Sequence, residues 1–102
     1  MDYSVKEDQT GVTIDLNGEL TVSDEEQFRS LCFDVTKRAG QKCVADLSQL
    51  SFLDSAGLGL LLVLKEMCED VDKQLTLRVG NSAVRDILDI SEFSSLIPYE
   101  TS

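Results

Sequence analysis

The sequence KCVADLSQLSFLDSAGLG, residues 42–59, decides the fold. Its first part, Lys42 to Leu47, is a short apolar run that predicts a buried strand. Ser48 to Phe52 is more polar and predicts a connecting turn. Leu53 to Gly59 then opens a segment whose apolar residues recur at helical spacing. A buried strand followed by a helix is the repeating unit of an α/β fold.

The residues after this stretch continue the alternation of helix and strand. Leu60 to Val71 keeps the helical spacing and predicts a well-buried helix. Gln74 to Val79 alternates between apolar and polar residues and predicts a strand. Gly80 to Ser82 can cap a third helix. Leu96 and Ile97, just before a proline, predict a short last strand.

The residues before the stretch begin with a predicted hairpin. Tyr3 to Lys6 and Val12 to Leu16 both alternate, and the residues between them form a polar turn. Asn17 to Leu20 continues or closes the second strand. The order β-β-α-β-α-β-α-β predicts an α/β fold with a mixed sheet, in which an antiparallel N-terminal hairpin joins parallel strands flanked by about three helices.

The first helix is predicted from a capping box. Ser23 supplies a hydroxyl at the N-cap and Glu26 follows three residues later. Gly40 is expected to end the helix. The residues predicted to face inward are Phe28, Leu31, Cys32, Val35 and Ala39.

Charge and length restrict the possible partners. The 102 residues suit one domain. They include 9 basic and 19 acidic residues, so the net charge is −10. Such a surface repels phosphate groups, so nucleic acids and anionic membranes are not expected as partners, whereas a protein with basic contact residues is. The longest apolar stretch, Leu58 to Leu64, is too short to cross a bilayer. The start at Met1 lacks the pattern of a signal peptide, so we expect a cytoplasmic protein.

The residue types that are present also restrict the chemistry. There is no histidine, which excludes a Ser-His-Asp or Cys-His triad and makes a metal centre unexpected. The three cysteines form no CxxC pair, so we interpret them as small buried side chains in a reducing compartment. We therefore expect neither an enzyme nor a bound cofactor or metal.

Asp54 and Ser55 lie where a helix follows the carboxyl end of a strand, the place where open α/β sheets meet their ligands. The free N–H groups of a helix start can hold an anion, so a phosphoryl group on Ser55 would have suitable surroundings. Leu53 and Leu58 offer apolar contacts beside the serine. The simpler interpretation, which the spacing alone favours, is that an Asp or Ser at this place is an ordinary N-cap.

The sequence LSFLDSAGLG, residues 50–59, resembles the signature of the anti-sigma factor antagonists, the STAS domain family. Asn17-Gly18-Glu19-Leu20 and the order of the elements match that family as well, over roughly residues 5–93. The resemblance implies that Ser55 is phosphorylated by a GHKL-type serine kinase that is itself the anti-sigma factor. It implies that a PP2C-type phosphatase removes the phosphate. The unmodified protein would bind the kinase and release its other client.

The resemblance also implies where the partner would bind. The loop from Thr21 to Asp24 is expected to lie next to the phosphorylation loop. The expected partner-binding residues are Thr21, Ser23, Asp24, Leu53, Asp54, Ser55, Ala56, Gly57, Leu58 and Gly59.

Two departures from the family accompany the resemblance. Thr21 stands where the family often has an aspartate, so this position cannot supply a charge. The chain stops at Ser102, so the further C-terminal helix of the family is expected to be short or absent. We therefore expect residues 1–102 to form a single STAS domain, as a monomer or a weak dimer.

Three other hypotheses remain for Ser55. A carrier protein would bear a prosthetic group there, although such carriers are all-helical and have leucine after the serine. A hydrolase would need Lys65 as its base, and that residue lies too far along the helix. A scaffold of the same family would never be phosphorylated. If phosphorylation does occur, we expect release of the partner by local electrostatics, without refolding.

Overall fold

A four-stranded sheet with the order β1-β2-β3-β4 forms the centre of the computed structural model, which describes residues 1–100. The strands are β1 (Asp2–Glu7), β2 (Gly11–Leu20), β3 (Lys42–Leu53) and β4 (Gln74–Arg78). β1 pairs antiparallel with β2, whereas β2, β3 and β4 run parallel. The predicted mixed sheet is confirmed.

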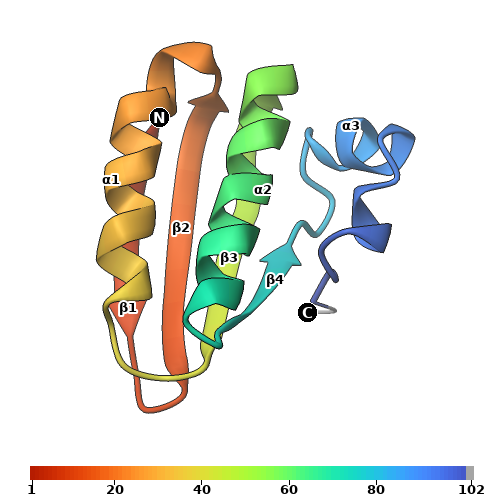
Figure 1. The fold of residues 1–102 in the computed structure, drawn as a ribbon. Coiled ribbons are helices and arrows are strands. Elements are labelled where there is room, and N and C mark those ends of the chain that lie inside the picture. The colour runs from red at the N-terminus through yellow and green to blue at the C-terminus, as the bar shows by residue number, and fades with distance from the viewer. Residues whose placement is uncertain (101–102) are drawn as a thin grey trace.

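The helices of the described residues are the 3-10 turn η1 (Val22–Asp24), α1 (Glu25–Thr36), α2 (Ser55–Asp70), α3 (Arg85–Ile90) and the 3-10 turn η2 (Phe93–Ser95). Of these, α1 and α2 connect the parallel strands, and α3 follows the last strand. Figure 1 shows α1 and α2 side by side on one face of the sheet, with α3 beyond β4 and close to the C-terminal segment. The first halves of α1 and α2 therefore lie near the end of the molecule where β2 and β3 finish.

The strands bury their side chains on the helix-bearing face only. Buried strand residues include Val12, Ile14, Leu16, Cys43, Ala45, Leu47, Leu75 and Leu77. Between them, Thr13, Asp15 and Val44 are partly exposed on the opposite face. The prediction of a buried strand at Lys42–Leu47 is therefore corrected to a strand buried on one face. The apolar side chain of Val44 concealed this alternation in the sequence.

The prediction that this strand ends at Leu47 is wrong. β3 continues through Ser48–Phe52, which was predicted to be a turn, and ends at Leu53. Its pairing with β2 shifts register twice along this stretch. At the first shift, Asp46 Oδ1 accepts hydrogen bonds from the Ser48 N–H at 2.9 Å and the Ser48 hydroxyl at 2.6 Å. Extra residues in one strand break the alternation with period two, which made this polar segment look like a turn.

The ends of α1 also differ from the prediction. The capping box lies at Thr21 and Asp24, two residues earlier than expected, and the Thr21 N–H donates to Asp24 Oδ2 at 2.9 Å. The short turn η1 separates this box from α1. The helix ends at Thr36 rather than near Gly40, and Ala39 is exposed instead of facing the core.

The predicted last strand at Leu96–Ile97 is wrong. Ile97 is fully buried and follows the turn η2, so the chain there turns into the core. The segment then runs along β4 for one isolated parallel bridge, between Leu77 and Tyr99.

Lys73 ties together the two connections at the other end of the molecule. Its side-chain ammonium donates to the carbonyl oxygen of Arg38 at 2.7 Å and to that of Gly40 at 2.5 Å. Only 6 % of Lys73 is exposed. The lysine therefore links the turn before β4 to the segment between α1 and β3.

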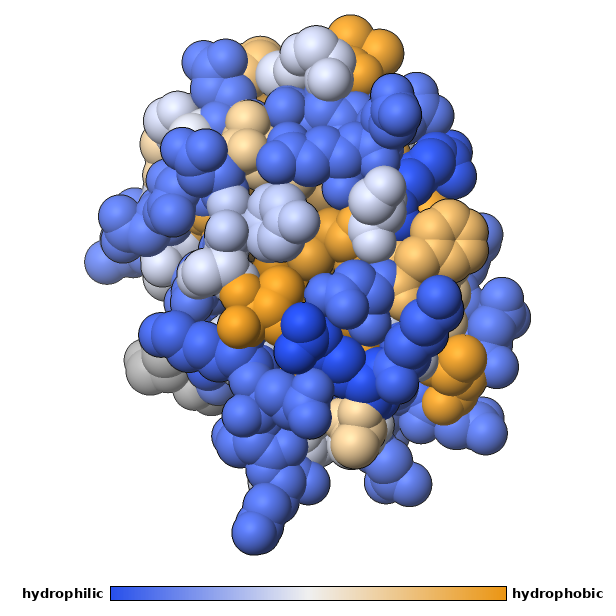
Figure 2. Space-filling view, turned by 90° about the vertical axis from the view of Figure 1, so that its left-hand side faces the viewer, coloured by the Kyte–Doolittle hydropathy of each residue, from blue (hydrophilic) through white to orange (hydrophobic). Residues whose placement is uncertain are grey.

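Figure 2 shows the side of the molecule that faces left in Figure 1, where α1 and β1 lie. The surface is mostly hydrophilic, with apolar groups exposed in separate places. The large apolar side chains that are exposed to solvent include Tyr3, Val22 and Phe33.

Candidate functional site

The candidate site begins with Ser55, the first residue of α2, whose side chain is exposed. Asp54 precedes it as the N-cap residue in an extended conformation. Asp54 Oδ1 accepts the N–H of Gly57 at 2.8 Å, and the Asp54 carbonyl accepts the N–H of Leu58 at 3.0 Å. Because two of the first helical N–H groups are thus satisfied by Asp54, Ser55 is held at the tip of the helix with its hydroxyl toward solvent.

Asp54 also connects α2 to the loop before α1. Its second oxygen, Oδ2, accepts the N–H of Val22 at 3.2 Å, and its own N–H donates to the Leu20 carbonyl at 3.3 Å. The loop from Thr21 to Asp24 therefore lies directly beside the start of α2, where the sequence prediction put it. Asp54 therefore joins the two predicted parts of the site, the loop from Thr21 to Asp24 and the start of α2.

Asp24 fixes the conformation of that neighbouring loop. Besides the Thr21 N–H, Asp24 is bonded to the terminal amine of Met1, at 3.1 Å from Oδ1. The Thr21 and Ser23 hydroxyl oxygens are 2.8 Å apart. The hydrogen bond from the Thr21 N–H holds the pKa of Asp24 below its ordinary value, so the carboxylate is ionised at neutral pH. Thr21 itself brings no charge but donates to Asp24, which supplies one.

The two glycines of the motif have different surroundings. A Cβ on Gly57 would collide with the carbonyl oxygen of Leu20, so α2 can approach the end of β2 only with glycine there. A Cβ on Gly59 would meet nothing within 4 Å. Gly57 is therefore required by the packing of the loop, whereas Gly59 is not required by any contact within the described residues.

The predicted partner-binding residues divide by exposure. Ser23, Ser55 and Gly59 are exposed, and Leu53 and Gly57 are buried. The others, namely Thr21, Asp24, Asp54, Ala56 and Leu58, are partly exposed. Leu53 is only 1 % exposed, so it supports the loop from inside the core and does not offer the apolar contact expected of it.

The structure adds residues that the sequence prediction missed. A shallow groove of about 260 Å³ between α1 and α2 is lined by Glu25, Arg29, Ala56 and Gly59, among others. Arg29 Nε lies 3.2 Å from Glu25 Oε1. Val22 is 64 % exposed at the tip of the loop. An apolar valine among the polar residues of the predicted loop from Thr21 to Asp24 was the available signal for Val22, but nothing in the spacing placed Arg29 against α2.

The described residues contain no cluster of three or more His, Cys, Asp or Glu side chains that could hold a metal ion. Cys32, Cys43 and Cys68 are free and fully buried. In residues 1–100, no helix combines the length and the apolar character needed to cross a membrane. The site therefore consists of a hydroxyl, carboxylates and backbone groups at a protein surface.

The chain is thus a small α/β module. Its candidate site is a serine exposed at a helix start beside an aspartate that bonds to a neighbouring loop, so the site lies on the surface rather than in a cleft. The model of the STAS domain family matches residues 3–102, and the chain belongs to that family. A STAS-domain containing protein of Pseudomonas aeruginosa is 31% identical over 85 residues, which cover 83% of this chain and 83% of the relative. BtrV of Bordetella bronchiseptica, named as a candidate anti-sigma factor antagonist, is 28% identical over 87 residues, 85% of this chain and 75% of the relative.

Solved structures share the fold. The unphosphorylated form of the anti-sigma factor antagonist SpoIIAA has a TM-score of 0.76 and 24% identity, covering 99% of this chain and 90% of that chain. The phosphorylated form of SpoIIAA has a TM-score of 0.71 with 24% identity, covering 99% and 93%. This fold contains a sheet, whereas carrier proteins that bear a prosthetic group on serine are all-helical. The carrier hypothesis for Ser55 is therefore disfavoured.

Proposed function

We propose that this chain is an anti-sigma factor antagonist that works by partner switching. Its unphosphorylated form binds a serine kinase of the GHKL type that is also an anti-sigma factor, and the kinase then releases its client. Phosphorylation of Ser55 by that kinase ends the binding, and a PP2C-type phosphatase restores it. The names of BtrV and SpoIIAA support this role, and a cytoplasmic location is part of the proposal.

The observation that carries the proposal is the position of Ser55. The hydroxyl is exposed at the first residue of α2, while the neighbouring Asp54 carboxylate is engaged with the N–H groups of Gly57 and Val22. The serine is thus presented at a fixed place to an external kinase. The surface for that kinase comprises the exposed parts of the loop before α1 and of the start of α2, which include Ser23 and Gly59.

Release follows from electrostatics. A phosphoryl group adds about −1.5 to −2 charges at neutral pH. It would lie beside the Asp54 carboxylate in a chain whose net charge is already −10. Burying such a group in an interface without a matching cation costs several kcal/mol, whereas the neutral hydroxyl costs little. A penalty of about 3 kcal/mol weakens binding by more than about a hundredfold.

The test is to incubate the chain with a purified GHKL-type kinase and ATP, and then to map the modified residue by mass spectrometry. We expect one phosphate on Ser55 in the wild type and in the control Ser23→Ala, and none in Ser55→Ala. Calorimetry should show that the phosphorylated chain binds the kinase about a hundredfold more weakly than the unmodified chain. A phosphate on another residue, or equal affinities, would contradict the proposal.

Two further observations separate the alternatives. Intact mass of protein extracted from cells distinguishes a phosphoryl group from a much heavier prosthetic group on Ser55. A chain that stays unmodified after incubation with the kinase and ATP, and yet binds the kinase, would indicate a scaffold that is never phosphorylated.

A further inference from the structure

Two of the three buried cysteines are in contact with each other. Cys43 lies near the start of β3 and Cys68 in the last turn of α2, and the Cys43 thiol donates a hydrogen bond to the Cys68 sulfur. Cys32 of α1 lies in the same part of the core, but within residues 1–100 it makes no side-chain hydrogen bond to either thiol. Cys43 and Cys68 therefore form a pair, and Cys32 is a neighbour of that pair.

The two chain segments that carry the pair are bonded to each other. The Cys68 carbonyl accepts the Lys73 N–H at 2.8 Å, and the Lys73 ammonium donates to two carbonyl oxygens of the segment before β3. The Gln74 N–H donates to the carbonyl of Gln41, two residues before Cys43, at 2.7 Å. These bonds hold the end of α2 against the start of β3, so the two thiols stay together.

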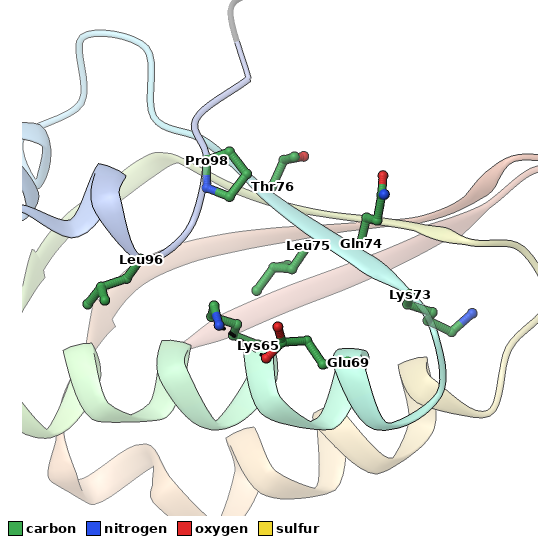
Figure 3. Close-up of a pocket in the computed structure, with 8 residues that line it drawn as sticks. All are labelled: Lys65, Glu69, Lys73, Gln74, Leu75, Thr76, Leu96 and Pro98. Carbon is green, nitrogen blue, oxygen red and sulfur yellow. Dashed lines mark hydrogen bonds and ion pairs between the residues drawn. The ribbon is translucent and has the colours of Figure 1, made fainter.

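A pocket of about 460 Å³ lies next to both cysteines. Its lining includes Glu69, which follows Cys68 in α2, and Leu75, which pairs with Cys43 across β3 and β4. Figure 3 shows that Leu75 points from β4 toward α2. Cys43 and Cys68 are themselves 0 % exposed, so a bulky reagent cannot reach them, but the pocket brings a small molecule to their immediate neighbours.

The surroundings give the two thiols different roles. The hydrogen bond from Cys43 and the nearby charge of Lys73 hold the pKa of the Cys68 thiol below its ordinary value. The same hydrogen bond, together with burial, raises the pKa of Cys43, so that thiol stays protonated. The thiolate is the form of cysteine that attacks an oxidant, and Cys68 is therefore the better nucleophile of the two.

We propose that Cys68 and Cys43 form a site of reversible oxidation by hydroperoxides, in which Cys68 attacks the oxidant and Cys43 completes a disulfide. The Cys68 sulfur attacks one oxygen of hydrogen peroxide, so an S–O bond forms, the O–O bond breaks, and the leaving hydroxide takes the Cys68 proton to become water. The Cys43 sulfur then attacks the Cys68 sulfur, so the S–S bond forms, the S–O bond breaks, and a second water leaves with the Cys43 proton. The two thiols lose two electrons, and the peroxide is reduced to two molecules of water.

The inference does not depend on phosphorylation or on the proposed function. The disulfide would join the end of α2 to β3, whereas Ser55 begins α2 at the opposite end. In a reducing compartment such a bond is transient, because thiol reductants reverse it by exchange. The free thiols of the structure correspond to the reduced form of the site.

The test is to treat the folded chain with hydrogen peroxide, to remove the oxidant with catalase, and to block the remaining thiols with N-ethylmaleimide in denaturant. Peptide mass spectrometry then identifies the oxidised residues. We expect a disulfide between Cys43 and Cys68, with Cys32 carrying the maleimide. The Cys68 thiol should disappear at least about tenfold faster than the Cys32 thiol, because its thiolate is more abundant and the pocket lies beside it. Dithiothreitol should restore both thiols of the pair.

Variants of the chain complete the test. Cys32→Ala is the matched control, because it removes a buried thiol from the same part of the core and should leave the disulfide unchanged. Cys68→Ala should leave Cys43 unoxidised, whereas Cys43→Ala should leave a sulfenic acid on Cys68 that dimedone traps. Circular dichroism checks that each variant keeps the fold. Ser55→Ala should form the disulfide as the wild type does, which separates this inference from the proposed function.

Three results with the wild-type chain would overturn the inference, whether or not the variants fold. The first is that all thiols survive a peroxide concentration that oxidises the denatured chain. The second is loss of the Cys32 thiol as fast as that of Cys68, which would indicate general opening of the core. The third is a disulfide that involves Cys32 or joins two chains.

Discussion

The Asp54 carboxylate accepts N–H groups from two different elements, Val22 of η1 and Gly57 of α2, one oxygen for each. Replacing it with alanine removes the cap of α2 and leaves the Val22 N–H without its partner. We expect Asp54→Ala to lower the free energy of unfolding by about 1–3 kcal/mol. Asp54→Asn keeps one acceptor oxygen and should lose about half as much. Urea denaturation measures both, and an alanine variant as stable as the wild type would contradict the bridging role.

The two motif glycines provide a matched pair of substitutions. Gly57→Ala places a methyl group against the Leu20 carbonyl, so α2 or β2 must shift. We expect a loss of about 1–3 kcal/mol in the free energy of unfolding. Gly59→Ala meets no atom and improves helix propensity, so it should raise stability by up to about 1 kcal/mol. Thermal unfolding of both variants distinguishes the two roles, and equal effects would refute the distinction.

The segment between α1 and β3 is bonded to the turn before β4 through Lys73, whose ammonium donates to two carbonyl oxygens. Lys73→Met keeps most of the length of the side chain but leaves both partly buried acceptors without this donor. We expect it to lower the free energy of unfolding by about 2–3 kcal/mol. Lys65→Met removes only an exposed ion pair from α2 and should change stability by less than about 0.5 kcal/mol. If both variants unfolded at the same urea concentration, the link through Lys73 would be unimportant.

The three cysteines come from α1, β3 and α2 and are all inside the core. Burial raises the pKa of Cys32 to about 12, so its reactive thiolate is essentially absent at neutral pH. We expect a coloured disulfide reagent to label no cysteine in the native protein and all of them in denaturant. Rapid labelling of the native protein would show that this part of the core opens.

Helices and strands could be predicted from the sequence wherever a single spacing of apolar residues continued through the whole element. Residues 12–16 and 74–78 alternate over their whole length, and both are strands. Element ends were not predictable, because they depend on contacts that are distant in the sequence. β3 passes through Ser48–Phe52 since bulges fit it against β2, and α1 starts late because Asp24 bonds back to Thr21. Ile97 was misplaced because its burial comes from packing, which the short apolar pair did not reveal.

For the whole molecule, acid should be destabilising. Hydrogen bonds hold the pKa of Asp24 below its ordinary value. At Asp46, burial raises the pKa, but the hydrogen bonds from Ser48 lower it by more, so this pKa is also below its ordinary value. A carboxylate whose pKa is lower in the folded state stabilises the fold above its unfolded pKa. That stability is lost as pH falls through the folded pKa. We expect urea midpoints to fall below about pH 4, and Asp24→Asn to flatten this dependence. A midpoint that rises with acid would contradict the assignment.

The candidate site was predicted in part because it is assembled from two short segments. The motif at residues 53–59 could be found from the sequence, and the loop from Thr21 to Asp24 was placed by family resemblance. The burial of Leu53 and the closeness of Arg29 to α2 depend on how the helices pack. That residues 1–102 form a single domain, with the C-terminal helix of the family short or absent, stays a prediction.

Because a single carboxylate holds both loops, the two form one thermodynamic cycle. Any ligand that draws Val22 away from Asp54 breaks one of the hydrogen bonds between η1 and the start of α2, and any change that displaces the Asp54 side chain takes the acceptor away from the Val22 N–H. The two effects must be equal in free energy, whichever is measured first. A change in the occupancy of one segment can therefore be measured at the other, which lies directly beside it.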